Sequence, residues 1–435
     1  MPCLRRPLLG DRSVKPDLKS LHREKLQAQF ADWGEPAYRV DQLLRWLYPL
    51  RATAWDQMTN LPKPLRARLA ESYSLHGLQL ARLQGAEGGT RKFLWRLADH
   101  ALIESVLIPA NPALYGEASD RNTLCVSTQV GCAYGCKFCA SGLNGYQRNL
   151  EPYEIVEQVL AVERWHAGRR PEVGGQRPEV GGQKPEVGGQ KPEVGDQVSG
   201  IRHPASALRL VDNLVIMGMG EPLANYDNLL QALTILNAPW GGAIGARKIT
   251  ISTSGLVPQI RRLADEPFQF NLAISLHAAT DEVRSRLMPV NRKYPLSDLV
   301  SACEYYRAQK GRLLTFEYIL IAGMNDGLDQ AKALAPLARR LNAKVNLIPY
   351  NRVEGLRWER PDEATQEVFL AALERQKVKA TLRREKGHDI DAACGQLRLR
   401  TEQELAERGF DEGTRPGRGR DAALKRPGLT AKLPR

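Results

Sequence analysis

Three cysteines lie within eight residues in the stretch Gly131-Cys132-Ala133-Tyr134-Gly135-Cys136-Lys137-Phe138-Cys139. Thiolates select iron–sulfur clusters and zinc, and one loop with three of them can hold such a centre. A structural zinc site normally has four protein ligands, whereas a [4Fe-4S] cluster held by three cysteines keeps one iron open for a small molecule. The next cysteines are Cys125, which would have to bend back from a predicted strand, and the distant Cys303. The spacing therefore favours an iron–sulfur cluster over zinc or over inert buried thiols.

The composition is typical of an intracellular enzyme that binds a polyanion. The 435 residues can form one large core and a small accessory domain. Seven cysteines, an odd number, indicate metal or redox chemistry in a reducing compartment rather than a disulfide scaffold. The net charge of +13 favours a partner such as nucleic acid. No signal peptide or 18-residue apolar segment is recognisable, so we expect a cytoplasmic protein without a membrane span.

The first 78 residues predict a small helical domain. Residues 1–19 read as a disordered basic lead-in, and residues 20–78 as a helical module with helices after Asp17, after Pro36 and after Pro64. Basic side chains on this module are Arg39, Arg45 and Arg51. A solvated surface and an RNA-docking role are equally compatible with these charges.

Residues 79–112 predict a β-hairpin linker. Two apolar runs, 93–97 and 102–108, flank a short polar turn. Glu104 lies in the second run among apolar neighbours, and a carboxylate that faces inward there would suit a general base. The pattern alone favours the alternative, in which Glu104 points to solvent.

From residue 113 to 400 the pattern alternates between strand and helix. Strands are predicted near 124–130, 211–217, 247–253, 270–276, 313–321 and 343–349, and helices near 151–167, 226–236, 256–264, 279–288, 328–341 and 362–376. Six such units predict an α/β fold with parallel strands, either a barrel or an open sheet. Functional residues should then gather at the carboxyl ends of the strands.

Two segments carry no core-forming pattern. Residues 170–197 repeat a heptad rich in Pro, Gly, Glu and Lys or Arg, which predicts a disordered insertion within the barrel. Residues 401–435 read as a disordered basic tail that adds nonspecific affinity for phosphate.

Polar groups follow four of the predicted strands. Gly220 and Glu221 lie in a glycine-rich loop, where the backbone can approach a ligand and a carboxylate can bind an ammonium group. Hydroxyl and imidazole groups follow the next strands at Ser252, at Ser275-Leu276-His277 and, after the sixth strand, at Asn351. Each alone is weak evidence, since a tight turn or a structural histidine is equally compatible. A barrel would bring all of them to one pocket.

Cys394, between small residues in Ala392-Ala393-Cys394-Gly395, is the last candidate reactive group. It is sterically accessible, and a nucleophilic role and an incidental one are equally compatible with the pattern. Cys125 carries the same ambiguity, whereas Cys3 and Cys303 favour a purely structural role.

Taken together, these motifs resemble the RlmN/Cfr family of radical S-adenosylmethionine (SAM) RNA adenosine methyltransferases, over about residues 20 to 400. The resemblance rests on residues 124–139, on 217–222, on 252–255, on Ser275-Leu276-His277 and on 389–397. It implies a partial (β/α)6 radical SAM barrel with a small N-terminal helical domain and a β-hairpin extension.

The resemblance also implies a role for each candidate residue. Cys132, Cys136 and Cys139 would bind one [4Fe-4S] cluster, whose open iron binds SAM, with two SAM molecules used per turnover. The positions that match the cofactor site are Gly220, Glu221, Ser252, Ser275, Leu276, His277 and Asn351. Cys394 would carry a methyl group and form a protein–RNA crosslink after hydrogen abstraction. Glu104 would accept a proton, and Cys125 would release the product by forming a transient disulfide with Cys394.

The implied substrates are an adenosine at the peptidyl transferase centre of 23S rRNA and the adenosine 3′ of the anticodon in tRNAs. We expect methylation at C2, by a monomer that takes electrons from a flavodoxin-type reductant. Methylation at C8 of the same rRNA adenosine, a Cfr-type activity that gives antibiotic resistance, is the alternative. A radical enzyme that acts on a small molecule or on a glycyl-radical protein, and a non-enzymatic zinc/RNA-binding protein, are more remote ones.

Overall fold

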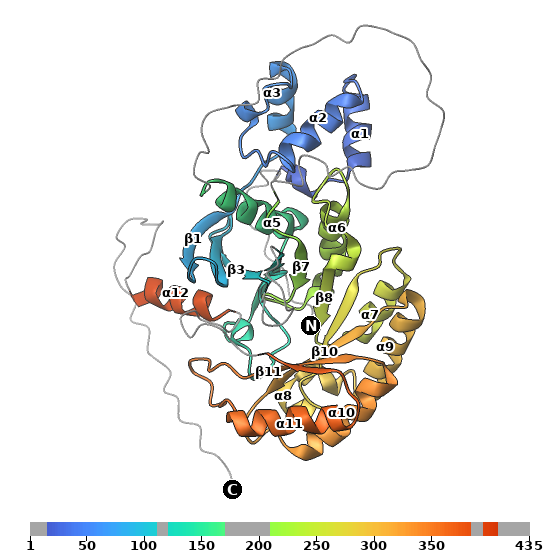
Figure 1. The fold of residues 1–435 in the computed structure, drawn as a ribbon. Coiled ribbons are helices and arrows are strands. Elements are labelled where there is room, and N and C mark those ends of the chain that lie inside the picture. The colour runs from blue at the N-terminus through green and yellow to red at the C-terminus, as the bar shows by residue number, and fades with distance from the viewer. Residues whose placement is uncertain (1–14, 111–120, 170–208, 384–394, 408–435) are drawn as a thin grey trace, which may run out of the picture. The chain divides into compact units, whose positions relative to one another are not determined.

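The computed structural model describes residues 15–110, 121–169, 209–383 and 395–407. Ten strands form one sheet in the order β1-β2-β3-β4-β7-β8-β9-β10-β11-β12 (Figure 1). Strands β1 to β4 pair antiparallel, and β4 and the strands beyond it pair in parallel. The strands are β1 (Gln79–Gln84), β2 (Arg91–Arg96), β3 (Leu102–Pro109), β4 (Asn122–Cys125), β7 (Asn213–Ile216), β8 (Ile249–Thr253), β9 (Asn271–Ser275), β10 (Leu314–Leu320), β11 (Lys344–Pro349) and β12 (Ala380–Leu382).

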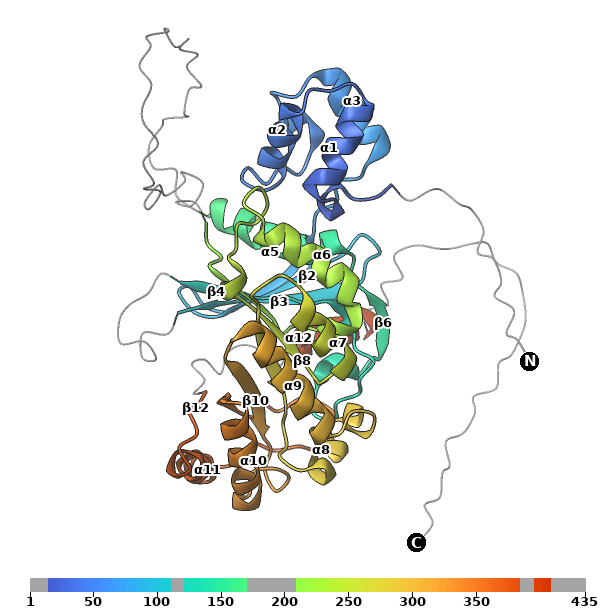
Figure 2. The ribbon, with the colours of Figure 1, turned by 90° about the vertical axis from the view of Figure 1, so that its right-hand side faces the viewer.

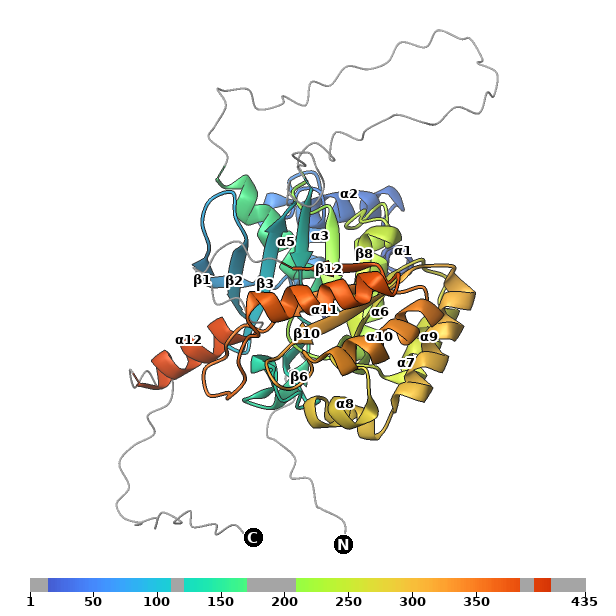
Figure 3. The same ribbon diagram turned by 60° about the horizontal axis from the view of Figure 1, so that its bottom comes forward.

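The helices of the described ranges follow the predicted alternation, except that α9 and α12 were not predicted. They are α1 (Arg23–Asp32), α2 (Tyr38–Leu47), α3 (Lys63–Ser72), α5 (Pro152–Ala167), α6 (Tyr226–Asn237), α7 (Val257–Asp265), α8 (Asp281–Leu287), α9 (Leu296–Lys310), α10 (Leu328–Arg340), α11 (Glu363–Arg375) and α12 (Gln396–Glu407). Helices α5 and α6 lie side by side (Figure 2), and so do α10 and α11 (Figure 3). The α/β class with a parallel sheet is confirmed. Strands β2 and β3 form the predicted hairpin, and β3 pairs with β4, so the hairpin extends the barrel sheet.

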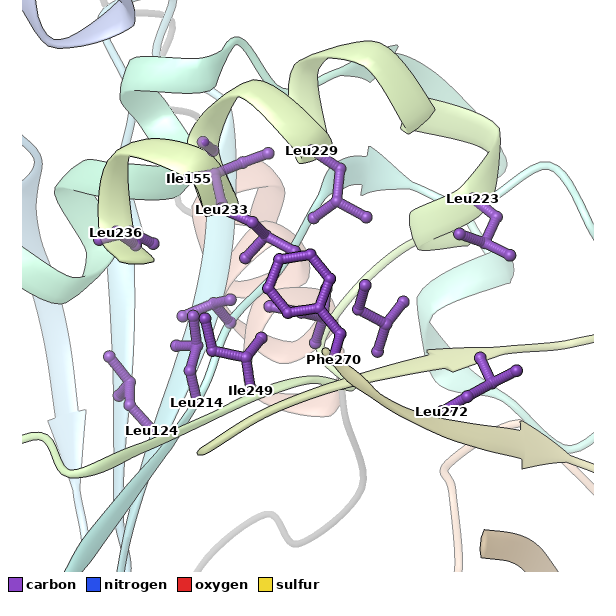
Figure 4. Close-up of a cluster of buried hydrophobic side chains, with 14 of the residues drawn as sticks. Leu124, Ile155, Leu214, Leu223, Leu229, Leu233, Leu236, Ile249, Phe270 and Leu272 are labelled. Atoms are coloured by element: carbon purple, nitrogen blue, oxygen red, sulfur yellow. The ribbon is translucent and has the colours of Figure 1, made fainter. Parts of the chain in front are cut away.

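The two faces of the parallel sheet differ in chemistry because side chains alternate along each strand. One face packs against the helices, and Figure 4 shows its apolar side chains meeting those of α5 and α6. Leu124, Leu214, Ile249 and Leu272 lie on this face with at most 1% of their surface exposed. The other face, which we call the inner face, carries polar side chains such as Ser275 and Glu317.

The predicted strand over 124–130 is divided in two. Strand β4 ends at Cys125, and the short β5 (Gln129–Gly131) pairs instead with β6 (Tyr146–Asn149). Ser127 explains the break: its amide donates to Gln158 Oε1 at 2.8 Å and its hydroxyl to the Glu104 carbonyl at 2.6 Å. These side-chain bonds take the place of ladder bonds.

The helical module begins earlier than predicted. A short 3-10 helix, η1 (Leu18–Ser20), is capped by Asp17 and buries Leu18 completely. Lys19 lies 3.3 Å from Glu157 of α5, which attaches this segment to the barrel. The boundary at residue 19 is therefore wrong for residues 15–19, because they form part of the packed module. The heptad insertion at 170–197 and residues 1–14 lie outside the described ranges.

The C-terminal boundary also differs from the prediction. Helix α12 continues past residue 400 to Glu407, so the first part of the expected disordered tail is helical. The remainder of the tail, residues 408–435, lies outside the described ranges.

Candidate active site

The cysteine loop starts at the end of β5 and closes on itself. The Cys132 amide donates to the Gly145 carbonyl at 3.1 Å, and the Cys139 amide donates to the Cys136 carbonyl at 3.2 Å. Gly131 has a φ of 78°, and a Cβ atom there would lie 1.9 Å from the Gly145 carbonyl oxygen. Only glycine fits at this position, which fixes the direction in which the loop leaves the strand.

The three thiols are compatible with a polynuclear cluster. Among the residues that the structure describes, no three His, Cys, Asp or Glu side chains gather closely enough to hold one metal ion. A [4Fe-4S] cluster does not require this, since each thiolate binds a different iron. Burial raises the pKa of the Cys132 thiol to about 11, and it raises that of Cys136 as well. Bound iron would supply the positive charge that such buried thiolates need.

The loop is attached to the parallel half of the sheet at three points. The Lys137 amide donates to the Leu287 carbonyl at the end of α8 (2.9 Å), and the Trp358 indole donates to the Lys137 carbonyl (2.8 Å). The Phe138 ring meets the His277 ring edge to face, with centroids 4.9 Å apart. Phe138, directly before the third cysteine, thus packs against the end of β9.

Glu221 organises the loops beside the cysteines. It is buried, with Oε1 accepting from the Leu223 amide at 3.1 Å and Oε2 accepting from the Ser254 amide at 2.7 Å. Burial raises the pKa of this carboxyl group, and the hydrogen bonds from Ser254 oppose that rise. The carboxylate therefore holds the end of β8 close to the loop after β7, and its remaining lone pairs are available to a ligand.

Gly220 lets this loop approach β5. Its φ is 99°, and a Cβ atom there would lie 2.5 Å from the Cβ of Gln129. The Gln129 side chain accepts a hydrogen bond from the Glu221 amide at 2.8 Å. The glycine thus lets the Glu221 loop approach the strand that leads into the cysteine loop.

The ends of β8 and β9 are joined by hydroxyls and by a buried arginine. Ser252 Oγ and Ser275 Oγ lie 3.2 Å apart. Arg284 has no exposed surface and donates to the carbonyls of Ser254 (2.5 Å) and Leu276 (3.1 Å). Burial lowers the pKa of this guanidinium to about 10. Arg284 was not a predicted site residue, because a lone arginine on a short helix gives no sequence signal.

His277 is a neutral, fixed imidazole. Its φ is 57°, a rare value for a residue with a side chain, and its Nδ1 accepts from the Ile319 amide at 3.1 Å. Burial, helped by the charge of Arg284, lowers its pKa to about 3. The proton of the neutral ring therefore resides on Nε2, which can donate to a ligand. Leu276 is buried beside it, and Asn351 follows β11 with its side chain partly exposed.

Glu104 faces the interior and holds the start of α12. It is 2% exposed, its Oε2 accepts from the Gly395 amide (2.9 Å) and its Oε1 accepts from the Arg398 amide (2.8 Å). Lys92 of β2 is 1% exposed and lies 3.2 Å from Oε2. The carboxylate therefore satisfies amides of the first helical turn and forms a buried ion pair.

Cys125 lies on the same face of the sheet as this ion pair. It pairs with Val106, two residues beyond Glu104 on β3, and it is buried. Residues that are opposite each other, or two apart on one strand, point to the same face. Cys394 itself lies outside the described residues, but its chain neighbour Gly395 is bound to Glu104. Cys303, the predicted structural cysteine, is fully buried in α9.

The fold and the cysteine loop together define a class of enzyme. The structure is similar to the crystal structure of a radical SAM methyltransferase from Sphaerobacter thermophilus, with a TM-score of 0.73 and 40% identity over 88% of this chain and 98% of that one. The Radical SAM superfamily model matches residues 205–334, and the model of the ribosomal RNA large subunit methyltransferase N-terminal domain matches residues 16–75.

Relatives in sequence identify the family. A probable dual-specificity RNA methyltransferase RlmN 3 of Opitutus terrae is 50% identical over 90% of this chain and 96% of its own length. The probable RlmN of Akkermansia muciniphila is 46% identical over 89% and 97%. The RlmN of Anaeromyxobacter dehalogenans is 44% identical over 88% and 91%. The chain belongs to the RlmN family of radical SAM RNA methyltransferases, and the predicted family is thereby confirmed.

Proposed function

We propose that this enzyme methylates C2 of an adenosine at the peptidyl transferase centre of 23S rRNA and C2 of the adenosine 3′ of the anticodon in tRNAs. The observation that carries the proposal is the contact between Glu104 and the Gly395 amide, because it brings the proposed proton acceptor to the residue after Cys394. The dual-specificity names of the relatives and the match of residues 16–75 support these substrates. Arg45 is exposed on the helical module and suits RNA docking, whereas Arg51 is committed to an ion pair with Glu163.

The cysteine loop would hold one [4Fe-4S] cluster through Cys132, Cys136 and Cys139. The loops that carry Gly220, Glu221, Ser252, Ser275, Leu276, His277 and Asn351 would bind SAM, two molecules per turnover. When bound, the cluster and SAM supply the radical chemistry that an electron-poor carbon such as C2 requires. The electrons would come from a flavodoxin-type reductant, and we expect a cytoplasmic monomer. No helix in the described ranges is long and apolar enough to cross a membrane.

Glu104 would take the proton from C2 while Cys394 is joined to the RNA. Both carboxylate oxygens accept backbone amides of α12 in the described conformation. A carboxylate that takes up a proton loses acceptor capacity at one oxygen, so proton uptake weakens its hold on the first turn of α12. Cys125 would then attack the sulfur of Cys394 and release the methylated RNA. The resulting disulfide must be reduced in each cycle.

The test is nucleoside mass spectrometry of rRNA and tRNA from a strain that lacks its own C2 methyltransferase, with and without this gene. The proposal expects 2-methyladenosine in both RNAs. Appearance of 8-methyladenosine would overturn the C2 assignment, and absence of both from a cluster-loaded protein would overturn the proposed reaction.

Variants of three cysteines test the proposed roles. Cys394→Ala should abolish the product, and Cys125→Ala should leave RNA covalently attached to the protein, visible as a shifted band on a denaturing gel. Cys303→Ala is the matched control, because this thiol is buried within α9, and it should keep full activity. Full turnover by Cys394→Ala would contradict the mechanism.

A further inference from the structure

A buried glutamine holds the chain directly after Cys125. Gln158 of α5 has no exposed surface, and neither has Ser127. The Gln158 Oε1 accepts from the Ser127 amide at 2.8 Å, and its Nε2 donates to the Ser127 carbonyl at 2.9 Å. Oε1 also accepts from the hydroxyl of Ser105, the residue after Glu104 on β3, at 2.9 Å. One side chain therefore binds the backbone two residues from Cys125 and the residue next to Glu104.

The strand register shows what this side chain prevents. Strands β3 and β4 pair antiparallel, with Val106 opposite Cys125. The same register, continued by two residues, would place Ser127 opposite Glu104. Instead, the Ser127 amide donates to Gln158, and the Ser127 hydroxyl donates to the Glu104 carbonyl at 2.6 Å. The ladder therefore ends after Cys125, at the level of the proposed proton acceptor.

The residue between Cys125 and Ser127 is fixed from the other side of β4. The Val126 amide donates to the Val215 carbonyl of β7, and the Val126 carbonyl accepts from the Gly218 amide, both at 3.0 Å. Removal of the Gln158 amide would leave two buried backbone groups of Ser127 without partners, which is costly. Continued pairing with β3 is the nearest replacement. It would draw Ser127 toward β3 and change the position of the Cys125 sulfur.

We propose that Gln158 positions the Cys125 sulfur for its attack on Cys394. In this step the Cys125 thiol and the thioether that joins Cys394 to the RNA become a disulfide and a methyl group. The carbon keeps the electron pair of the broken S–C bond and receives the proton that the thiol gives up. Gln158 acts through Ser127, so it is a positioning residue and not a catalytic one. The inference rests on the proposed function and holds for either RNA carbon.

The decisive measurement is a single-turnover assay with the anaerobic, cluster-loaded full-length protein and tRNA. The covalent protein–RNA adduct is followed over time on a denaturing gel. Gln158→Met keeps the approximate size of the side chain and removes its hydrogen bonds to Ser127. The adduct of this variant should form within about threefold of the normal rate and decay roughly 10- to 100-fold more slowly, since a small misplacement of a reacting group has effects of this size.

Two further variants serve as controls. Gln158→Glu should let the adduct decay at close to the normal rate, because burial keeps the carboxyl group protonated, and a protonated carboxyl group both accepts and donates as the amide does. Gln366→Met should leave formation and decay unchanged. Gln366 is also a buried glutamine that donates to a backbone carbonyl, that of Pro361 at 2.7 Å, but it lies on α11. Thermal unfolding of each variant identifies any loss of folded protein.

The outcomes separate this proposal from the function on which it rests. Normal decay of the adduct in folded Gln158→Met would overturn the proposal. Equal slowing of formation and decay would also overturn it, because a merely structural role affects both steps. If no adduct formed even with Cys125→Ala, the proposed function would fail, and this proposal with it. Failure of the C2 assignment would show only in the nucleoside analysis.

Discussion

Two regions of one sheet use polar groups in opposite ways. At the antiparallel end, which we call the closed side, Lys92, Glu104 and the first turn of α12 bury an ion pair, with the two side chains 1% and 2% exposed. At the parallel end, which we call the open side, Ser275 and Asn346 remain partly exposed on the inner face. Polar groups of the closed side satisfy one another, whereas those of the open side keep capacity for a ligand. Substitutions on the closed side should therefore affect folding and chemistry together.

Glu104→Gln is the strongest test of the closed side. The amide cannot serve as the proposed proton acceptor and cannot accept two backbone amides as well as a carboxylate does. We expect methylation to fall roughly 100- to 10,000-fold and hydrogen exchange of the Gly395 and Arg398 amides to become faster. Glu154→Gln is the control for general destabilisation, because Glu154 is also a buried carboxylate in an ion pair, here with Arg148. Undiminished turnover by Glu104→Gln would remove the acid–base role.

Lys92→Met separates charge from hydrogen bonding on the closed side. It leaves Glu104 with its two amide donors but without the ammonium group, so a buried charge loses its partner. We expect the free energy of unfolding to fall by about 3 kcal/mol in urea denaturation. Arg286→Ala breaks an exposed ion pair with Glu282 and should cost less than about 1 kcal/mol. If both variants lost the same free energy of unfolding, the buried ion pair would contribute no more to stability than an exposed one.

Gly220→Ala tests the close approach of backbone on the open side. The variant must hold a φ of 99° and place a Cβ against Gln129, so we expect a loss of at least about 2 kcal/mol and weaker SAM binding. Gly311→Ala is the control. It also has a positive φ of 60° but has nothing within 4 Å, and should cost about 1 kcal/mol. If the two variants were equally stable, the contact with Gln129 would have no energetic weight.

The last test is the pH dependence of the stability, to which His277 contributes. The folded state keeps this ring neutral with a pKa of about 3, whereas the unfolded chain protonates it near pH 6.5. The unfolded state therefore binds more protons between these values, and stability must fall as the pH drops through this window. His277 should contribute about 1.4 kcal/mol per pH unit to the slope of the unfolding free energy against pH at pH 4 to 6, measured by urea denaturation. His277→Gln should reduce that slope by the same amount, and an unchanged slope would show that the ring is protonated in the fold.

Much of the barrel was predictable because its signals are local. The strands and helices from β7 to α11 follow apolar spacing and lie within a few residues of the predicted positions, with α9 as the exception. Helix α9 was missed although its signal was present: Leu299, Cys303 and Tyr306 recur at helical spacing between Pro295 and Gly311. The division of the first strand was not predictable, since it depends on contacts from Ser127 to Gln158 and Glu104.

The residues of the candidate site differ in the same way, because some have a local sequence signal and others do not. Residues that belong to contiguous motifs, such as the three cysteines, could be selected from the sequence. Lys92 and Arg284 could not, because their meaning comes from partners distant in the chain: a carboxylate on β3 for Lys92, and strand-end carbonyls for Arg284. The orientation of Glu104 was predicted with the wrong preference. Apolar residues lie on both faces of β3, Leu102 and Val106 on one and Ile103 and Leu107 on the other, so the sequence does not show which face is covered.

Glu163 on α5 bears on how many residues this fold can accommodate between α5 and β7. Its carboxylate accepts the amides of Leu210 (3.0 Å) and Val211 (2.9 Å), the point at which the chain returns to the sheet. The return to β7 is therefore fastened by α5. Closing a longer loop adds little entropy cost, so residues can be added to the connection between α5 and β7 with little effect on the stability of the barrel. This connection is thus a suitable position for an affinity tag or a fluorescent domain.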